Sequence, residues 1–200
     1  IGLIGNGAYV LVVHPAVAAK TVTEFIALAK ARPGQLTYAY TGYGNATHLA
    51  GELFKVLAGI DTVCIVYKGG GPALTDVMGG QIPAFFAGVA SGAAQIKAGK
   101  LRALGVTTTR RTAALPEVPT INESGVPGYE SITWFGLLAP MKTPAAIVSR
   151  LNELLVKVVR TPEMKAQFEM QGYDPVGGSA AEFSTFIRDE SEKYGRVVKS

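Results

Sequence analysis

A strand, a glycine-rich turn and an amphipathic helix follow one another between Thr37 and Gly59, and this unit constrains the fold more than any other stretch. Gly42 and Gly44 permit positive φ in the turn, so the backbone there can approach a ligand closely. Asn45 is the predicted N-cap of the helix. The apolar residues of the helix recur at helical period: Leu49, Leu53, Val56 and Leu57. The first turn of such a helix has unpaired N–H groups and a partial positive charge, which predicts a site for a carboxylate or phosphate. A purely structural turn is the alternative, because strand–turn–helix units are common in α/β proteins.

A second unit of the same design follows directly. Thr62–Tyr67 is the predicted strand, and Lys68–Gly71 is a turn of one lysine and three glycines. Pro72 is predicted at the first helical position, where proline is favoured because that residue needs no N–H partner. The helix is expected to end at Gly79.

The same alternation continues for one more unit and a final strand. Ile82–Phe86 is the predicted third strand, Ala87–Ser91 a loop, Gly92–Ala98 a short helix and Leu101–Val106 the fourth strand. Repeated strand–helix units with short connections indicate a largely parallel sheet covered by helices. Ligands are expected at the carboxyl ends of its strands, where the three loops of these units gather.

The segments on either side of these units also carry clear signals. Ala8–His14 is predicted as a buried strand, and Thr21 with Glu24 as a capping box that opens a helix. The proline-rich stretch Thr107–Tyr129 is predicted as a connecting arm. Ile132–Ala139 is predicted as a further strand.

After this strand the chain is predicted to be wholly helical. Start and stop signals place three helices at about 144–160, 162–171 and 180–198. Their apolar stripes need a sheet to lie on, and the sequence offers no unused strands for one.

The composition limits the class of protein and its partners. With 48% hydrophobic and 17% charged residues, the 200-residue chain can bury a real core. Its apolar runs stop short of the ~18 residues that a membrane span needs. The net charge of +4 comes from scattered basic residues, which argues against nucleic acid and favours a small anionic ligand. The single cysteine, Cys64, lies in an apolar run and is predicted to be a buried strand thiol.

Several kinds of enzyme site are disfavoured by the motifs. A dinucleotide site would need a third glycine where Thr47 stands. The run around Ser91 is displaced by one position from a nucleophile elbow, and only His14 and His48 are available as bases. The two histidines and Cys64 are widely separated in sequence, which argues against a zinc site. No catalytic residue, metal or cofactor is therefore expected.

Two polar residues near the turns have open roles. His48 falls in the first turn of the central helix, where it is either a surface or packing residue or a donor to an anion. Lys68 is either a solvated cation or the partner of a bound acid.

Blocks of residues along the whole chain resemble one family of transport receptors. The blocks are Gly42-x-Gly44-x-x-x-His48-Leu49-Ala50-Gly51-Glu52-Leu53-Phe54, Tyr67-Lys68-Gly69-x-x-Pro72-Ala73-Leu74-Thr75-Asp76, Gly79-Gly80-Gln81, Ile96 to Leu104, Leu115-Pro116-x-Val118-Pro119-Thr120, Gly125-x-Pro127-Gly128-Tyr129 and Trp134 to Pro140. In order and spacing they resemble the Bug-type substrate receptors of tripartite tricarboxylate transporters.

The resemblance implies an α/β fold of the type II periplasmic binding class. Two α/β lobes would be joined by two crossing strands and would close on a small carboxylate. Residues 1–7 would be a crossing strand and hinge, 8–131 the second lobe, 132–140 the other crossing strand, and 141–200 helices of the first lobe. Most of that first lobe, and a signal peptide, would lie upstream of Ile1.

The ligand-facing positions follow from the same resemblance. They are Thr41, Gly42, Tyr43, Gly44, Asn45, Ala46, Thr47, His48, Lys68, Gly70, Gly71, Pro72, Ala73, Ala87 and Gly88. Backbone N–H groups at two helix N-termini would hold the carboxylate directly or through water. Members often carry Phe-Asp-Asn where this chain has Phe86-Ala87-Gly88, so we expect plain carboxylates to be preferred over amino acids. Tyr40 and Tyr43 are expected either to stack on a flat ligand or to pack within the loop.

The expected function is that of a non-catalytic receptor in the periplasm, which passes an organic acid to membrane transporter subunits. A carboxylate-sensing domain for signalling, and an α/β enzyme acting on a carboxylated or phosphorylated metabolite, are the alternatives. Residues 1–200 are also expected to bind weakly, because on this mapping they retain only one side of the cleft. Because their C-terminal helices lack a sheet, they are expected to self-associate.

Overall fold

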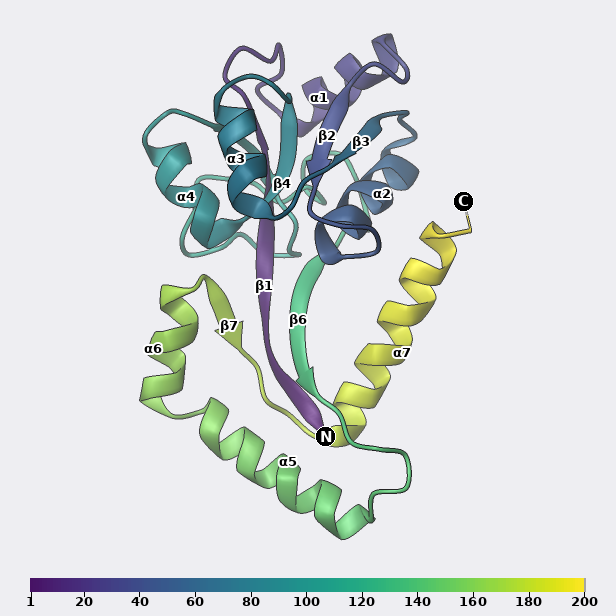
Figure 1. Ribbon diagram of the computed structural model, residues 1–200, viewed down its shortest axis with the longest axis vertical. Coiled ribbons are helices and arrows are strands. Elements are labelled where there is room, and N and C mark those ends of the chain that lie inside the picture. The colour runs from purple at the N-terminus through teal and green to yellow at the C-terminus, as the bar shows by residue number, and fades with distance from the viewer. Residues whose placement is uncertain (200) are drawn as a thin grey trace. The chain divides into compact units, whose positions relative to one another are not determined.

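The computed structural model describes residues 1–199; Ser200, the last residue of the predicted C-terminal helical segment, lies outside the described residues. The chain forms two compact units, which are described separately. Unit 1 consists of Ile1–Gly7 and the segment from Thr133 onward, and unit 2 of Ala8–Ile132. Strand β1 (Gly2–Val13) contributes residues to both (Figure 1). This strand begins six residues before the predicted Ala8 start.

Unit 2 is built on a five-strand path in the order β3-β2-β4-β1-β5. The other strands are β2 (Thr37–Tyr40), β3 (Val63–Val66), β4 (Ala84–Gly88) and β5 (Arg102–Val106). β2 runs parallel to both β3 and β4, whereas β1 runs antiparallel to β4 and β5. The predicted largely parallel α/β sheet is therefore confirmed, with β1 as its antiparallel member.

Four helices belong to this sheet: α1 (Val22–Ala31), α2 (Ala46–Ala58), α3 (Gly70–Met78) and α4 (Val89–Lys97). The Thr21 hydroxyl caps α1 by accepting the Glu24 N–H. The Glu24 carboxylate accepts the N–H of Lys20 instead of that of Thr21, so only half of the predicted capping box forms. α2 ends at Gly59 with a φ of 60°, as its glycine stop predicts.

Two of the helix starts that the sequence predicted are wrong. α3 starts at Gly70, so Pro72 is its third residue; proline fits throughout a first turn, because no N–H there has an intrahelical partner. β4 continues through Gly88, and α4 starts at Val89. The predicted loop Ala87–Ser91 is therefore the end of a strand and the first turn of a helix. The ladder to β1 holds β4 extended as far as its Tyr9–Gly88 pair.

The apolar run of β3 is not buried, because β3 lies at the edge of the sheet. Val63, Ile65 and Val66 are 43%, 40% and 57% exposed. Cys64 between them is half-buried, so its prediction as a buried thiol is wrong. Hydrophobicity alone does not tell an edge strand from a central one.

The core of unit 2 lies around the central strands. Phe85 of β4 packs in one cluster with apolar residues of β1, α3 and β5. The proline-rich stretch after β5 also belongs to this unit's core, because Ile121 and Tyr129 are buried. The Tyr129 hydroxyl donates to the carbonyl oxygen of Ala50 in α2 at 3.0 Å. The predicted connecting arm is thus an integral part of unit 2.

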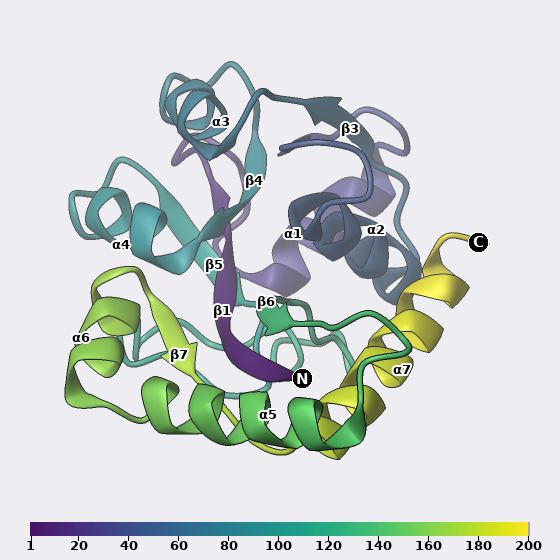
Figure 2. The same ribbon diagram turned by 60° about the horizontal axis from the view of Figure 1, so that its bottom comes forward.

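Unit 1 contains the helices α5 (Ala145–Val159), α6 (Pro162–Met170) and α7 (Ala180–Val197), which begin and end within one residue of the prediction. β6 (Ile132–Leu137) and β7 (Tyr173–Pro175) both pair with β1. β7 contacts α6 (Figure 2) and was not predicted, because three residues ending in proline carry no strand pattern. α6 buries none of its residues, and α5 leaves Ile147 and Val158 50% exposed.

Candidate functional site

The helices α2, α3 and α4 of unit 2 begin at one edge of the sheet (Figure 1). β2 lies between β3 and β4 and runs parallel to both, so the carboxyl ends of these strands meet at that edge. α2, α3 and α4 follow these strands after short connections or none. Tyr40 stands opposite Val66 at the last pair of β2 and β3, and the next N–H, that of Tyr67, donates to the Tyr40 carbonyl at 2.8 Å. The edge therefore collects three helix N-termini.

A polar network fixes the turn between β2 and α2. Asn45 Oδ1 accepts from the N–H of His48 at 3.1 Å and from the hydroxyl of Thr47 at 2.9 Å. Asn45 Nδ2 donates to Thr41 Oγ1 at 2.6 Å, and the Thr41 N–H donates to Thr47 Oγ1 at 3.0 Å. Asn45 is therefore the N-cap, as predicted, and its side chain ties the turn to the helix.

This cap leaves part of the α2 N-terminus available. The first helical hydrogen bond is donated by Leu49 to the Asn45 carbonyl at 3.0 Å, so the N–H groups of Ala46 and Thr47 have no intrahelical acceptor. Gly42 and Gly44 have φ of 138° and 70°, as the predicted turn requires. A Cβ placed at Gly44 would meet nothing within 4 Å, so the approach to the turn is open there.

The α3 N-terminus is more open, because it has no side-chain cap. Its N-cap is Gly69, with a φ of 123°, and the N–H groups of Gly70 and Gly71 precede the first helical hydrogen bond. A Cβ placed at Gly69 or Gly71 would meet nothing within 4 Å. Lys68 is exposed beside them and adds a full positive charge to the edge. Ala73, in contrast, is completely buried in the core and offers no side chain to a ligand.

Tyr67 anchors the start of this second turn. Its hydroxyl donates to Asp76 Oδ2 in α3 at 2.8 Å. Burial, followed by the interaction with the Asp76 carboxylate, raises the pKa of Tyr67, so the hydroxyl stays protonated as a donor.

The third helix N-terminus contributes backbone only. Ala87 is completely buried, so its methyl group does not reach the edge, and the half-buried Gly88 is the residue that does. The Ser91 hydroxyl donates to the Gly88 carbonyl at 2.9 Å. The Ser91 side chain is thus bonded to the backbone of the preceding strand end.

Two tyrosines next to the turn differ in what they offer a ligand. The ring of Tyr40 is 1% exposed, whereas that of Tyr43 is 82% exposed. The two ring centroids lie 5.3 Å apart in an edge-on arrangement. Burial, and then the hydrogen bond with Tyr43, raises the pKa of Tyr40 to about 12. Only Tyr43 is therefore open to stacking by a ligand, and Tyr40 packs within the loop.

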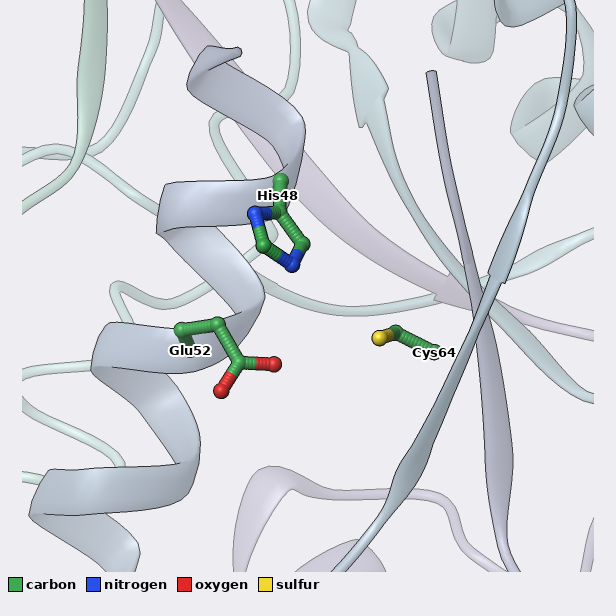
Figure 3. Close-up of side chains that lie close together, drawn as sticks. All are labelled: His48, Glu52 and Cys64. Carbon is green, nitrogen blue, oxygen red and sulfur yellow. The ribbon is translucent and has the colours of Figure 1, made fainter. Parts of the chain in front are cut away.

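His48 does not point to the helix N-terminus as a donor. Its Nδ1 atom accepts the N–H of Gly44 at 3.3 Å. Its ring packs against that of Tyr40, with the two ring centroids 4.6 Å apart. The ring lies beside Glu52 and Cys64 (Figure 3), and one ligating atom from each of these three side chains lies within 4.8 Å of the others. The wide spacing of His48 and Cys64 along the chain argued against a zinc site, but the structure brings these two side chains together with Glu52.

The signal for this cluster lies partly in the sequence. His48 and Glu52 are four residues apart on a helix and so share one face. Cys64 arrives there because β3 pairs with β2, where Cys64 stands opposite Tyr38. That register joins residues far apart in sequence, so local patterns do not predict it.

Comparisons with known proteins identify the family of the chain. The family described as "Tripartite tricarboxylate transporter family receptor" matches residues 1–200. This chain belongs to that receptor family. It is 32% identical over 199 residues to protein BugT of Bordetella pertussis, and 34% identical over 180 residues to a protein from the tcbD–tcbE intergenic region of Pseudomonas sp. strain P51.

Solved structures of related proteins share the fold of this receptor. Rpa4515 of R. palustris, solved with adipate, is 31% identical with a TM-score of 0.84, and covers 100% of this chain and 67% of its own. The periplasmic binding protein BugD is 26% identical with a TM-score of 0.82, again over 100% of this chain and 67% of its own. The predicted periplasmic-binding-protein fold is thereby confirmed.

The chain spans only part of the length of the two relatives compared by sequence. It spans 61% of BugT and 54% of the Pseudomonas protein. Across residues 1–199, no helix has the length and hydrophobicity to span a membrane.

Proposed function

We propose that this receptor binds a small organic carboxylate at the N-termini of α2 and α3 and passes it to membrane transporter subunits from the periplasm. The observation that carries the proposal is the uncapped, glycine-lined start of α3 beside the start of α2, at one edge of the sheet. The related protein Rpa4515 was solved with adipate, a dicarboxylate, and this supports the ligand class.

The physical basis is electrostatic and directional. Each helix N-terminus carries the equivalent of about half a positive charge, and its free N–H groups point outward. The N–H groups of Ala46, Thr47, Gly70 and Gly71 form a set of donors for carboxylate oxygens. Lys68 adds attraction that decreases with salt, because its side chain is exposed.

The first test removes one donor without disturbing the helix. Ala46 is the first residue of α2, and Asn45 before it has φ −78° and ψ 171°, a conformation that accepts a following proline. Ala46→Pro should therefore keep the fold and weaken carboxylate affinity several-fold, as calorimetry on the complete gene product would show. Ala180→Pro is the matched control, since Ala180 is the first residue of α7 after an equally extended Ser179. Equal affinity in both variants would place the site elsewhere.

The second test concerns selectivity. Gly88 carries no charge to pair with an α-ammonium group, so we propose that plain carboxylates bind better than aspartate or glutamate. Ala87 is buried and unsuitable for a test, but a Cβ at Gly88 would only contact Ser91 Oγ at 3.5 Å. Gly88→Asp should thus weaken binding of adipate-like acids and favour amino acids, in a thermal-shift panel of both classes, with Gly88→Asn as the uncharged control. Stabilisation of the parent protein by amino acids alone would contradict the proposal.

The domain assignment made from the sequence remains a proposal. We propose that residues 8–131 form one lobe of the receptor and that α5, α6 and α7 pack on the sheet of another. Residues 1–200 alone should then bind a carboxylate more weakly than the complete gene product. Equal affinity would show that unit 2 suffices.

A further inference from the structure

A mixed cluster of three metal-ligating side chains lies beside the α2 turn. His48 and Glu52 come from neighbouring turns of α2, and Cys64 comes from β3 (Figure 3). All three are half-buried, and one ligating atom from each lies within 4.8 Å of the others. The cluster is thus both concentrated and accessible to an ion from solvent.

The donor set is selective in its chemistry. An imidazole, a thiolate and a carboxylate together suit Zn²⁺, whereas Mg²⁺ and Ca²⁺ prefer oxygen ligands only. Bonds of about 2.0–2.3 Å would place ligand atoms of a tetrahedral zinc site roughly 3.3–3.7 Å apart. The ligating atoms need to close by at most about 1.1–1.5 Å to reach that spacing, which small side-chain rotations can supply. We propose that His48, Glu52 and Cys64 bind one Zn²⁺ ion, with a fourth position open to water or an external ligand.

A buried tyrosine already orients the carboxylate. Tyr38 is 4% exposed, and its hydroxyl donates to Glu52 Oε1 at 2.8 Å. This is the kind of outer-shell contact that orients a ligating carboxylate. Since Tyr38 stands opposite Cys64 in the β2–β3 ladder, the same register that brings the thiol to the cluster also brings the orienting hydroxyl.

Two present contacts compete with the ion. Lys55 Nζ lies 3.2 and 3.1 Å from the two carboxylate oxygens of Glu52 and would repel a dication. Gly44 donates its N–H to His48 Nδ1. When Nε2 binds a metal, Nδ1 carries the ring proton and can no longer accept a hydrogen bond. The Gly44 contact must therefore open, and the surrounding open space in the turn permits it. Zinc binding should consequently move the Gly44 turn.

The single cysteine gives a specific readout. The rate of iodoacetamide alkylation of the chain reports on Cys64 alone, and bound Zn²⁺ should slow it by about tenfold or more, because the metal-bound thiolate is protected. His48→Gln and Glu52→Gln should each remove most of this protection. His14→Gln is the matched control, as His14 is the other histidine of the chain, and it should keep full protection. Lys55→Gln removes the ammonium group beside Glu52 and should therefore lower the zinc concentration that gives half-maximal protection of Cys64.

The outcomes separate this site from simpler explanations. Full protection in His48→Gln or Glu52→Gln would overturn the three-ligand site, and so would a zinc-induced dimer that disappears in Cys64→Ser. Co²⁺ added to the unsubstituted chain gives a measurement that does not depend on how the variants fold. A thiolate-to-cobalt charge-transfer band that saturates at one ion per chain supports the site, and its absence overturns it. Neither result depends on carboxylate binding, so the proposed receptor function is tested separately.

Discussion

Both units contain helices with clear start and stop signals in the sequence, but the helices of unit 2 bury more of their residues than those of unit 1 do. In unit 2, the helices lie on a continuous sheet; α1, α2 and α3 each bury at least three residues, and the shorter α4 buries two. In unit 1, α5 and α7 bury two residues each and α6 buries none. The buried apolar residues described in unit 1 are Leu3, Leu155, Val159, Phe183 and Val197.

Helix signals therefore do not determine how much apolar surface a helix buries. α5 has a clear apolar stripe, yet Leu154 and Val158 on it are 43% and 50% exposed. The difference arises because a helix can bury its stripe only where another element offers an apolar face. Unit 2 provides that face with five strands, and unit 1 with short segments of β1, β6 and β7.

The largest expected difference is in core stability. Phe85 is 1% exposed in the unit 2 core, and Phe85→Ala should cost about 3–5 kcal/mol of the free energy of unfolding, through lost burial and a residual cavity. Leu154→Ala in α5 should cost only about 0.5 kcal/mol, because that side chain is largely solvated. Urea denaturation at a concentration where the chain is monomeric would compare them. Similar costs would show that the α5 stripe is already packed.

Self-association should come from unit 1. Ile147→Glu with Val158→Glu places two charges on the exposed stripe of α5, and should weaken association by about tenfold or more, equivalent to about 1.4 kcal/mol. Val56→Glu with Leu57→Glu is a matched control on α2, where the two side chains are 46% and 42% exposed. Light scattering over a concentration series would measure both. A chain that stays monomeric at all concentrations would contradict the expected self-association. Equal effects of the two pairs would contradict its assignment to unit 1.

The smallest effect concerns a helix start in unit 1. The Ser179 hydroxyl accepts the Glu182 N–H at 3.1 Å, and the Glu182 carboxylate accepts the Ser179 N–H at 2.7 Å, which completes the predicted capping box of α7. Ser179→Ala should cost about 1 kcal/mol at neutral pH. Thr21→Ala, at the half-formed box of α1, is the comparison in unit 2.

This cap also has a defined pH dependence. Hydrogen bonds from the Ser179 backbone and hydroxyl lower the pKa of Glu182 below its ordinary value. The stabilisation is therefore complete above the ordinary pKa of a glutamate and is lost as pH falls through the lowered one. The stability difference between the parent and Ser179→Ala should narrow in acid, and chemical denaturation at both ends of this range would measure it. A difference that grows in acid would contradict the assigned role of the cap.

The turns of the candidate site were accessible from the sequence. The turns at 41–48 and 68–71 were predicted because glycines and N-cap residues act locally and mark a turn that leads into a helix. That these residues bind a ligand stays a prediction. The side chain of Ala87 was assigned wrongly to the site. A continuous apolar run such as Ile82–Ala87 does not reveal where its strand ends, because the end is set by pairing with β1.

The sequence by itself determined which segments are helices, several of their N-caps and the alternation of strands with helices, because each depends on residues within about four positions along the chain. The tertiary structure decided which strand lies at the edge, where β4 ends, and which apolar stripes remain exposed. It also brought Cys64 beside His48 and Glu52. These features depend on ladders between distant segments, and the pairing of Tyr38 with Cys64 is set by the whole sheet and not by either strand alone.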